Sequence, residues 1–166
     1  MIFSPADLVL TRRGLRFMGR HLPCSIGRGG IRADKREGDG ATPVGEHRIT
    51  GMLYRPDRLP APQPWAEPIR PGDLWSDASG DPDYNSHVRA PYPASFETLR
   101  RADPLYDIVL VTDWNGDGRP NAGSAIFLHQ RRRAGYATEG CVAFARADLI
   151  WLAQRVPPGA RLIVRR

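Results

Sequence analysis

One histidine and one cysteine are spaced so that they could act as a base and a nucleophile. A short apolar run ends on His129, and after a polar, basic loop the chain returns through Gly140 and Cys141 into a second apolar run. A thiol attacks acyl carbons as its thiolate, which an adjacent imidazole can generate by taking the proton. Gly140 has no side chain, so its amide and that of Cys141 could approach a substrate and stabilise an oxyanion. One candidate chemistry is therefore cysteine-dependent acyl transfer.

The same spacing also fits an inert thiol. A buried Cys141 in a strand and a His129 whose hydrogen bonds are satisfied elsewhere would give this pattern without any chemistry. Glu139 opposes a thiolate, because a neighbouring carboxylate raises the pKa of a thiol. The three arginines at positions 131–133 offset that charge. The residue types alone leave both interpretations open.

Two other histidines are rival bases, and one other cysteine is a rival partner. His87 lies in a polar cluster and could hold substrate, whereas a surface imidazole is the simplest interpretation of His47. A disulfide between Cys24 and Cys141 would fit an oxidising compartment and would remove the nucleophile. We favour a buried, free Cys24.

Longer motifs around the pair carry a resemblance to a known family. The run Ala125–His129 is followed by Thr138–Phe144 and then by Arg146–Leu152, and Gly38–Gly45 contains a Thr-Pro-Val-Gly segment. Together they resemble the catalytic core and the Thr-Pro-x-Gly loop of the L,D-transpeptidase (YkuD-type) family, which cross-links peptidoglycan. The similarity extends from about Ile26 to the C-terminus.

The resemblance implies a role for each residue of the motif. Cys141 would be the acyl acceptor, His129 its base, and the amides of Gly140 and Cys141 the oxyanion hole. The expected function is an L,D-transpeptidase that acts on peptidoglycan stem peptides through a thioester on Cys141. The backbone carbonyl of Gln130 is expected to orient the His129 ring, and Glu139 is expected to contact substrate.

The sequence departs from the family pattern in two respects. The usual Ser-His-Gly-Cys-x-Arg reads Thr-Glu-Gly-Cys-Val-Ala over Thr138–Ala143, so the second His and the Arg are absent. The loop from His129 to Cys141 is also shorter than the family's common form. Two alternatives therefore remain: an L,D-carboxypeptidase or amidase that uses water as acceptor, and a non-catalytic module that binds peptidoglycan.

The elements that must position these residues are expected to be mainly strands. Apolar runs and period-two alternation predict strands at Leu8–Thr11, Leu15–Met18, Leu22–Ile26, Glu46–Tyr54, Leu105–Thr112 and Arg161–Val164. Apolar residues at helical spacing predict a helix over Arg146–Val156, which the following prolines end. The resemblance implies a mainly β fold, a β-sandwich of mixed sheets with a short helix after the cysteine, in one domain over residues 1–166.

Two segments are expected to be loops. Gly27–Gly45 is glycine-rich but opens no helix and lacks the Gly-Lys-Ser/Thr of a phosphate-binding loop; its Thr-Pro-Val-Gly turn is expected to shape one side of the cleft. Arg55–Pro104 is irregular and rich in proline and aromatic residues, which fits either a groove for sugars and peptides or a loop packed by its own rings. Within it we expect Tyr84, Asn85 and Arg89 to bind substrate, Arg89 by pairing with a carboxylate.

Charge and composition limit the classes of molecule that the chain is expected to bind. The net charge of +6 and the pI of about 10.0 suit an acidic partner such as a carboxylate-bearing stem peptide. Nucleic acid would fit the charge, but the basic residues are spread along the chain and no nucleic-acid module is present, so we predict no nucleic acid. No apolar run approaches the roughly 18 residues of a membrane span. The oligomeric state is not indicated.

The sequence predicts neither a metal site nor a signal peptide. Asp113–Ser124 opens like a calcium loop, but Ser124 occupies the position of the bidentate glutamate, so a polar hairpin loop is expected, with no metal and no cofactor. The N-terminus lacks the charged and apolar regions of a signal peptide. The family implies a periplasmic or cell-wall location, so either an upstream segment is missing or the role is cytoplasmic.

Overall fold

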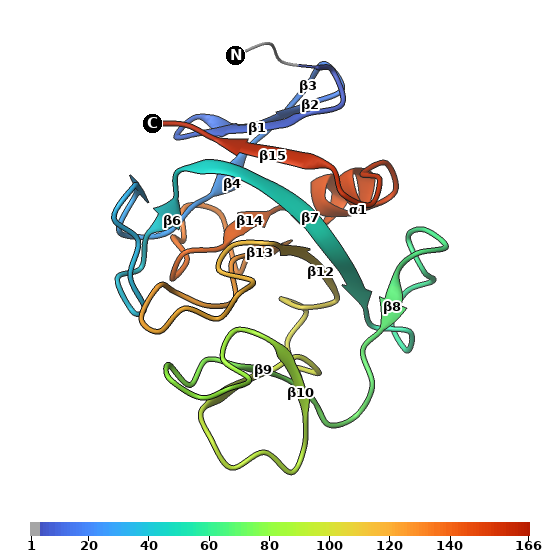
Figure 1. Ribbon diagram of the computed structural model, residues 1–166. Coiled ribbons are helices and arrows are strands. Elements are labelled where there is room, and N and C mark those ends of the chain that lie inside the picture. Colours follow the sequence, from blue (N-terminus) through green and yellow to red (C-terminus); the bar gives the residue numbers. More distant parts are fainter. Residues whose placement is uncertain (1–3) are drawn as a thin grey trace.

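Strand β7, Gly45–Tyr54, joins the two layers of the fold in the computed structural model, which describes residues 4–166. The first part of β7 pairs with β15, Arg161–Val164, and the last part pairs with β12, Ile108–Thr112. Because one long strand belongs to both layers, the sheet bends along β7. Figure 1 shows β15 and the N-terminal strands above and β12 below this bend.

The large sheet has ten strands in the order β3-β2-β1-β15-β7-β12-β13-β14-β4, with β8 paired to β7 outside this path. Its remaining members are β1 (Leu8–Thr11), β2 (Gly14–Phe17), β3 (Arg20–Leu22), β4 (Cys24–Ser25), β8 (Glu67–Pro68), β13 (Phe127–Gln130) and β14 (Val142–Phe144). Parallel and antiparallel pairs both occur. The expectation of mixed sheets in a mainly β fold is confirmed.

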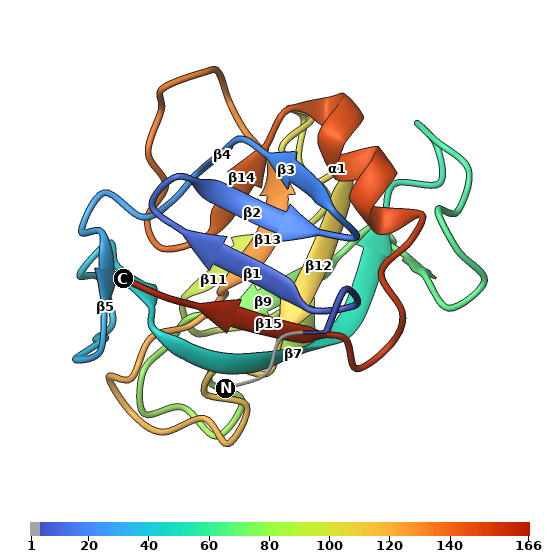
Figure 2. The ribbon, with the colours of Figure 1, turned by 90° about the horizontal axis from the view of Figure 1, so that it is seen from above.

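Pro23 marks the point where the chain passes between the layers. The predicted strand Leu22–Ile26 is split there: β3 pairs with β2, and β4 pairs with β14 in the other layer. Proline has no amide proton and cannot continue the ladder, which explains the break. Since β3 and β4 are the two ends of the strand order but neighbours in sequence, the sheet curls until its ends approach each other, as Figure 2 shows from above.

The main core fills the space between the layers. Fully buried side chains reach it from both, among them Leu8, Leu10, Ile49, Leu110, Leu128 and Phe144. Helix α1, Arg146–Ala153, packs into the same cluster through Leu149 and Leu152. The helix ends at Ala153, so it is shorter than the predicted Arg146–Val156. The short helix after the cysteine is confirmed.

The segment Arg55–Pro104, expected to be irregular, contains a second sheet. Strands β9 (Asp73–Ser76), β10 (His87–Arg89) and β11 (Phe96–Thr98) form it in the order β10-β9-β11, and we call it the small sheet. The expectation was wrong because each strand has only three or four residues, too few for a visible alternation. The loop Gly27–Gly45 likewise contains a short parallel pair, β5 (Ile31–Arg32) with β6 (Thr42–Pro43).

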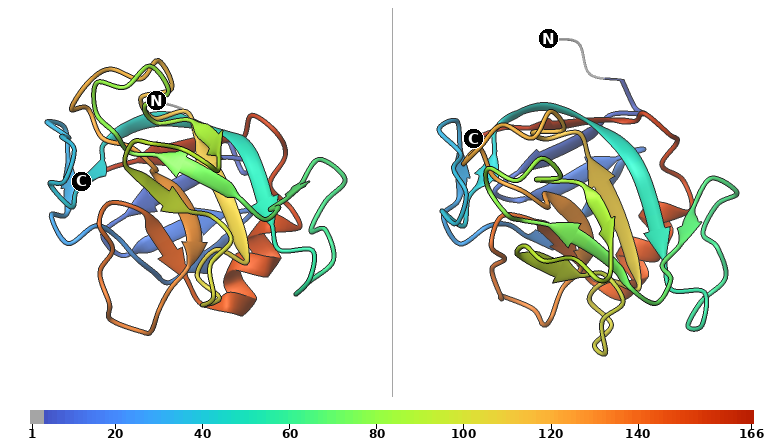
Figure 3. Two further views of the ribbon diagram at one scale, coloured as in Figure 1. Left: turned by 90° about the horizontal axis from the view of Figure 1, so that it is seen from below. Right: turned by 60° about the horizontal axis from the view of Figure 1, so that its bottom comes forward.

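The small sheet covers the face of β12 and β13 that points away from the main core (Figure 3). Along β12, Ile108 and Leu110 belong to the main core, whereas Val109 and Val111 belong to a second apolar cluster beneath the small sheet. The Trp75 ring meets the Phe127 ring edge to face at 4.9 Å between centroids. Period-two alternation thus supplies apolar side chains to both faces of the same strands.

Leu99→Ala tests how firmly the small sheet is attached. Leu99 is fully buried in the second cluster, so its truncation should lower the free energy of unfolding by about 3 kcal/mol in urea titrations. Phe96→Ala, at an exposed ring of β11, is the matched control and should cost less than about 1 kcal/mol. Equal losses for the two variants would contradict the packing described.

Candidate active site

The parallel pairing of β13 with β14 brings Cys141 and His129 to one face. Leu128 is level with Val142 and both are buried in the main core. Because side chains alternate along a strand, His129 and the residue just before Val142 point to the opposite face. There they line a single cavity of about 400 Å³. The structure brings the predicted nucleophile and base together.

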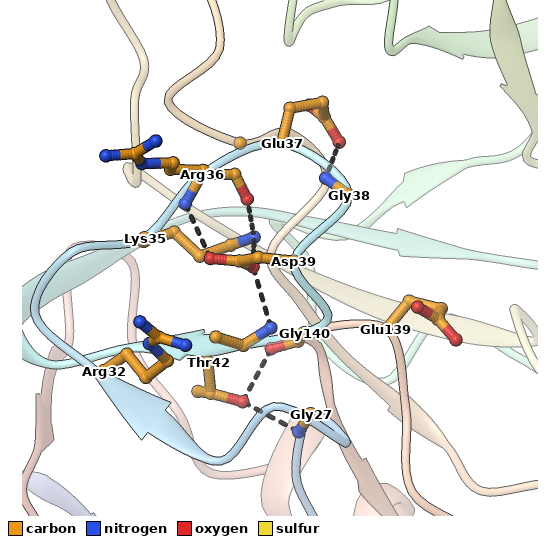
Figure 4. Close-up of polar contacts among 12 residues, drawn as sticks. Gly27, Arg32, Lys35, Arg36, Glu37, Gly38, Asp39, Thr42, Glu139 and Gly140 are labelled. Atoms are coloured by element: carbon orange, nitrogen blue, oxygen red, sulfur yellow. Dashed lines mark hydrogen bonds and ion pairs between the residues drawn. The ribbon is translucent and has the colours of Figure 1, made fainter.

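The turn before Cys141 is fixed by Thr42 (Figure 4). Its Oγ1 donates to the Gly140 carbonyl at 2.8 Å and accepts from the Gly27 amide at 2.9 Å. Gly140 has φ +140°, and a Cβ there would lie 2.9 Å from the Ala41 carbonyl oxygen, so only glycine fits. The Thr-Pro-Val-Gly segment is therefore packed directly against the Gly-Cys turn.

An ion pair holds the loop that carries Thr42. The buried Lys35 ammonium donates to Asp39 Oδ1 at 2.6 Å, and the same carboxylate accepts from the Arg36 and Ala41 amides (Figure 4). Asp39 thereby fixes the backbone next to Thr42. The glycine-rich loop therefore holds the Gly-Cys turn in place through Asp39 and Thr42.

Thr138 organises the turn from its other side. Its Oγ1 donates to the Cys141 carbonyl at 2.5 Å and accepts from the Gly140 amide at 3.2 Å. Of the two predicted oxyanion donors, the Gly140 amide is thus engaged within the turn.

The Cys141 thiol is protonated at rest. It donates to the Ala125 carbonyl at 3.0 Å, and the Phe127 amide donates to Sγ at 3.4 Å. Burial, assisted by the Glu97 carboxylate, raises the pKa of Cys141 to about 12, although the Phe127 amide and the Lys35 charge act against this. The thiolate needed for attack must therefore form as the proton leaves.

His129 is a neutral imidazole at pH 7. Burial lowers its pKa to about 4, against the raising effect of the Gln130 carbonyl. That carbonyl lies 2.8 Å from Nδ1, so Nδ1 carries the proton and Nε2 is the acceptor. The orienting role predicted for Gln130 is confirmed. A neutral acceptor nitrogen is the form that a general base requires.

The cavity has a mixed but net basic lining. Arg101, Arg131 and Arg132 contribute positive charge, and Glu97 and Glu139 contribute negative charge. The exposed Glu139 carboxylate pairs with Arg28 Nε at 2.9 Å. Glu139 is the one predicted substrate-binding residue that lies in this cavity.

The other three predicted substrate-binding residues lie elsewhere. Tyr84 is buried and donates to Glu37, and Arg89 faces Asp73 at 3.6 Å on β10. Asn85 is also buried: its Oδ1 accepts from Trp75 Nε1 at 3.0 Å and from the Ala125 amide at 2.9 Å. Asn85 therefore does not line the cavity. It holds the amide of Ala125, and the carbonyl of Ala125 accepts the hydrogen bond that the Cys141 thiol donates.

The rival histidines are not beside the thiol. His47 is buried, with Nε2 3.3 Å from the Pro43 carbonyl and its ring against Trp114. His87 Nε2 lies 3.3 Å from Asp73 Oδ1 on the small sheet. Neither residue lines the cavity of Cys141 and His129.

Both cysteines are free, and they lie on opposite faces of the sheet. Cys24 pairs with Phe144 and packs against the main core, whereas Cys141 packs against the second cluster. Burial raises the pKa of Cys24 to about 12. The structure contains no Cys24–Cys141 disulfide. A free Cys24 is confirmed, but the residue is half-buried rather than buried.

Residues 4–166 contain no group of three or more His, Cys, Asp or Glu side chains that could hold a metal ion. Within the same residues, no helix has both the length and the apolar character needed to cross a membrane.

The sequence matches a known protein family over nearly its whole length. A family model described as the L,D-transpeptidase catalytic domain matches residues 5–164. The chain belongs to this family. No curated protein sequence matches the chain.

Three solved structures are similar over nearly the whole chain. An L,D-transpeptidase from Mycobacterium smegmatis has a TM-score of 0.45 and 14% identity, with 96% of this chain and 58% of that chain covered. The L,D-transpeptidase from Xylanimonas cellulosilytica has a TM-score of 0.42 and 17% identity, with 98% of this chain and 62% of that chain covered. The helical cell shape determining protein Pgp2 from Campylobacter jejuni has a TM-score of 0.42 and 18% identity, with 96% of this chain and 47% of that chain covered. The chain spans less than two thirds of each of these proteins.

The sequence did not point to Glu97, Arg101 or Tyr106 as residues of the candidate active-site cavity. Glu97, Arg101 and Tyr106 line it, and the Tyr106 hydroxyl donates to Glu97 Oε2 at 2.7 Å. Burial raises the pKa of both groups. Glu97 reaches the cavity because β11 pairs with β9, and no local motif marks that pairing.

Thr42→Val tests the support of the Gly-Cys turn. Losing Oγ1 leaves the buried Gly140 carbonyl and Gly27 amide without this partner, which should lower the free energy of unfolding by about 2 to 4 kcal/mol. Thr42→Ser keeps the hydroxyl and should stay within about 1 kcal/mol of wild type. Urea titrations compare the three proteins, and a Val variant as stable as the Ser variant would exclude this role.

The pH dependence of thiol alkylation tests the neutral pair. In a Cys24→Ala background, iodoacetamide labelling of Cys141 should be slow at about pH 7 and rise about tenfold per pH unit up to about pH 9, because the raised pKa keeps the thiol protonated. His129→Ala should change this profile little. A plateau below about pH 8 that His129→Ala removes would instead show a preformed thiolate and imidazolium.

Proposed function

We propose that this chain is a cysteine-dependent L,D-transpeptidase that acts on peptidoglycan stem peptides through a thioester on Cys141. The observation that carries the proposal is the shared cavity of Cys141 and His129, in which the imidazole is neutral and Nε2 is its proton acceptor. Membership of the L,D-transpeptidase family supports the same reaction class.

The proposed first half of the reaction forms the acyl-enzyme. As Sγ attacks a peptide carbonyl carbon beside a D-centre, the thiol proton moves to His129 Nε2, so that no thiolate accumulates beforehand. The Cys141 amide stabilises the oxyanion, and the Gly140 amide contributes if it turns from Thr138. The C–N bond then breaks, His129 gives its proton to the departing amine, and a thioester remains.

The second half transfers the acyl group. An acceptor amine attacks the thioester carbonyl, gives a proton to His129, and forms the new amide while the sulfur leaves and regains that proton. Water in place of the amine would give hydrolysis, the carboxypeptidase or amidase alternative. The identity of the acceptor separates the two.

Charges around the cavity support a carboxylate-bearing substrate. Three arginines line it, and Arg101 pairs internally with Asp103 while Arg131 and Arg132 lie on the loop after β13. A guanidinium binds a carboxylate through parallel hydrogen bonds. Stem peptides offer such carboxylates, and their occurrence in the cell wall makes a periplasmic or cell-wall location part of this proposal.

A second candidate function is a non-catalytic peptidoglycan-binding module. It is favoured by the thiol's hydrogen bond to the Ala125 carbonyl, by the raised pKa of Cys141, and by Glu139 and Ala143 at the positions of the family's His and Arg. Such a module would bind stem peptides without cleaving them.

His129→Ala distinguishes these functions. With a stem tetrapeptide and an acceptor amine, the variant should lose about 10²- to 10⁴-fold in kcat/KM, because it lacks the group that moves the proton. Release of the terminal residue is followed by mass spectrometry with and without the amine. Cross-linked product identifies a transpeptidase, and release unaffected by the amine identifies a hydrolase.

The matched control is His21→Ala, an exposed histidine on β3 whose ring contacts the Arg13 carbonyl. It should turn over like wild type. Wild-type protein that binds the tetrapeptide but releases nothing, with or without amine, would overturn the catalytic proposal in favour of the binding module.

A further inference from the structure

A second cavity, of about 460 Å³, lies at the other edge of the small sheet. The active-site cavity is lined from the β11 side, by Glu97, whereas the second is lined by β9 and β10, through Trp75 and Arg89. Because β9 is the central strand, the two cavities flank the small sheet. We call the second cavity the tryptophan groove, since Trp65 and Trp75 both line it. Its volume suits a small ligand.

Two residues of the tryptophan groove have a buried polar atom without a hydrogen bond. Among residues 4–166, three buried side-chain polar atoms have no hydrogen bond: Trp65 Nε1, Asp73 Oδ1 and Asp77 Oδ1. Two of these three belong to residues that line the groove. Leaving a buried polar group without a hydrogen bond destabilises the folded state, so such groups are rare in folded proteins. Trp65 Nε1 is an N–H donor, whereas Asp73 Oδ1 is a carboxylate oxygen with His87 Nε2 at 3.3 Å and an Arg89 nitrogen at 3.6 Å as its charged neighbours.

The charges of the groove are balanced. Arg70 and Arg89 face Glu67 and Asp73 around the lining, and His87 lies 3.3 Å from Asp73 Oδ1. The active-site cavity has three arginines against two glutamates. An anionic peptide is thus favoured at the active site, whereas a ligand without net charge fits the groove.

We propose that the tryptophan groove binds an uncharged saccharide. Two half-buried indoles line the groove, and aromatic rings of this kind pack against sugar rings. The hydroxyl groups of a saccharide can also accept from the Trp65 N–H and donate to a carboxylate such as that of Asp73 or Glu67. A ligand with a net charge does not match the balanced charges of this lining. The saccharide would bind across the small sheet from the thiol, so that one polymer bearing both sugars and peptides could occupy both cavities.

The test is a titration of the full chain with tri-N-acetylchitotriose, an uncharged oligosaccharide, followed by ¹⁵N–¹H NMR of the four tryptophan indoles. The Trp65 and Trp75 Nε1–H signals should shift saturably, and those of Trp114 and Trp151 should not. Trp65→Phe keeps a ring but removes the donor, and it should weaken binding about tenfold. Asp73→Asn should weaken it similarly.

Trp151→Phe is the matched control, because Trp151 lies on helix α1 against Phe17 and does not line the groove. It should bind like wild type, as should Cys141→Ala, which separates this proposal from the proposed catalysis. Absence of a saturable shift at Trp65 and Trp75 in wild type would overturn the proposal even if a variant fails to fold. Unchanged affinity in folded Trp65→Phe and Asp73→Asn, or tighter binding of a stem tetrapeptide at the same signals, would also overturn it.

Discussion

The site depends on one constraint, the parallel register of β13 with β14. With Leu128 level with Val142, the alternation of side chains sends His129 and Cys141 to the same face. A shift of one residue in either strand would separate them, because it would move one of the two into the main core. Burial of Leu128 and Val142 between the layers makes such a shift costly. By fixing the register, the core thus fixes the relative positions of the two side chains.

The small sheet gives this pair its electrostatic character. By covering the outer face of β12 and β13 it removes water from the thiol and the imidazole, which raises the pKa of Cys141 and lowers that of His129. Both groups are consequently neutral at rest, and the pair differs from one that holds a permanent thiolate. The same sheet separates the active-site cavity from the tryptophan groove, so its attachment matters to both proposals.

Much of the fold could be predicted from the sequence, and less of the site. The strands Leu8–Thr11 and Arg161–Val164 were predicted with their observed bounds because their apolar runs are continuous and end at clear turns. The pair of Cys141 and His129 was found from a motif. Glu97 and Asn85 could not be placed, since their positions depend on the small sheet, whose three short strands leave no periodic pattern. The positions of these residues depend on strand pairing between segments that are distant in sequence, which local hydrophobic patterns do not reveal.

The most direct test of the account is to trap the acyl-enzyme. Cys24→Ala protein, in which Cys141 is the remaining thiol, is mixed with a stem tetrapeptide in the absence of acceptor amines, quenched in acid and measured by intact mass. The account predicts an adduct of the tripeptidyl acyl group that maps to Cys141 and is absent from Cys141→Ala. Stoichiometric peptide binding with no covalent adduct at any time would contradict it and leave the chain as a binding module.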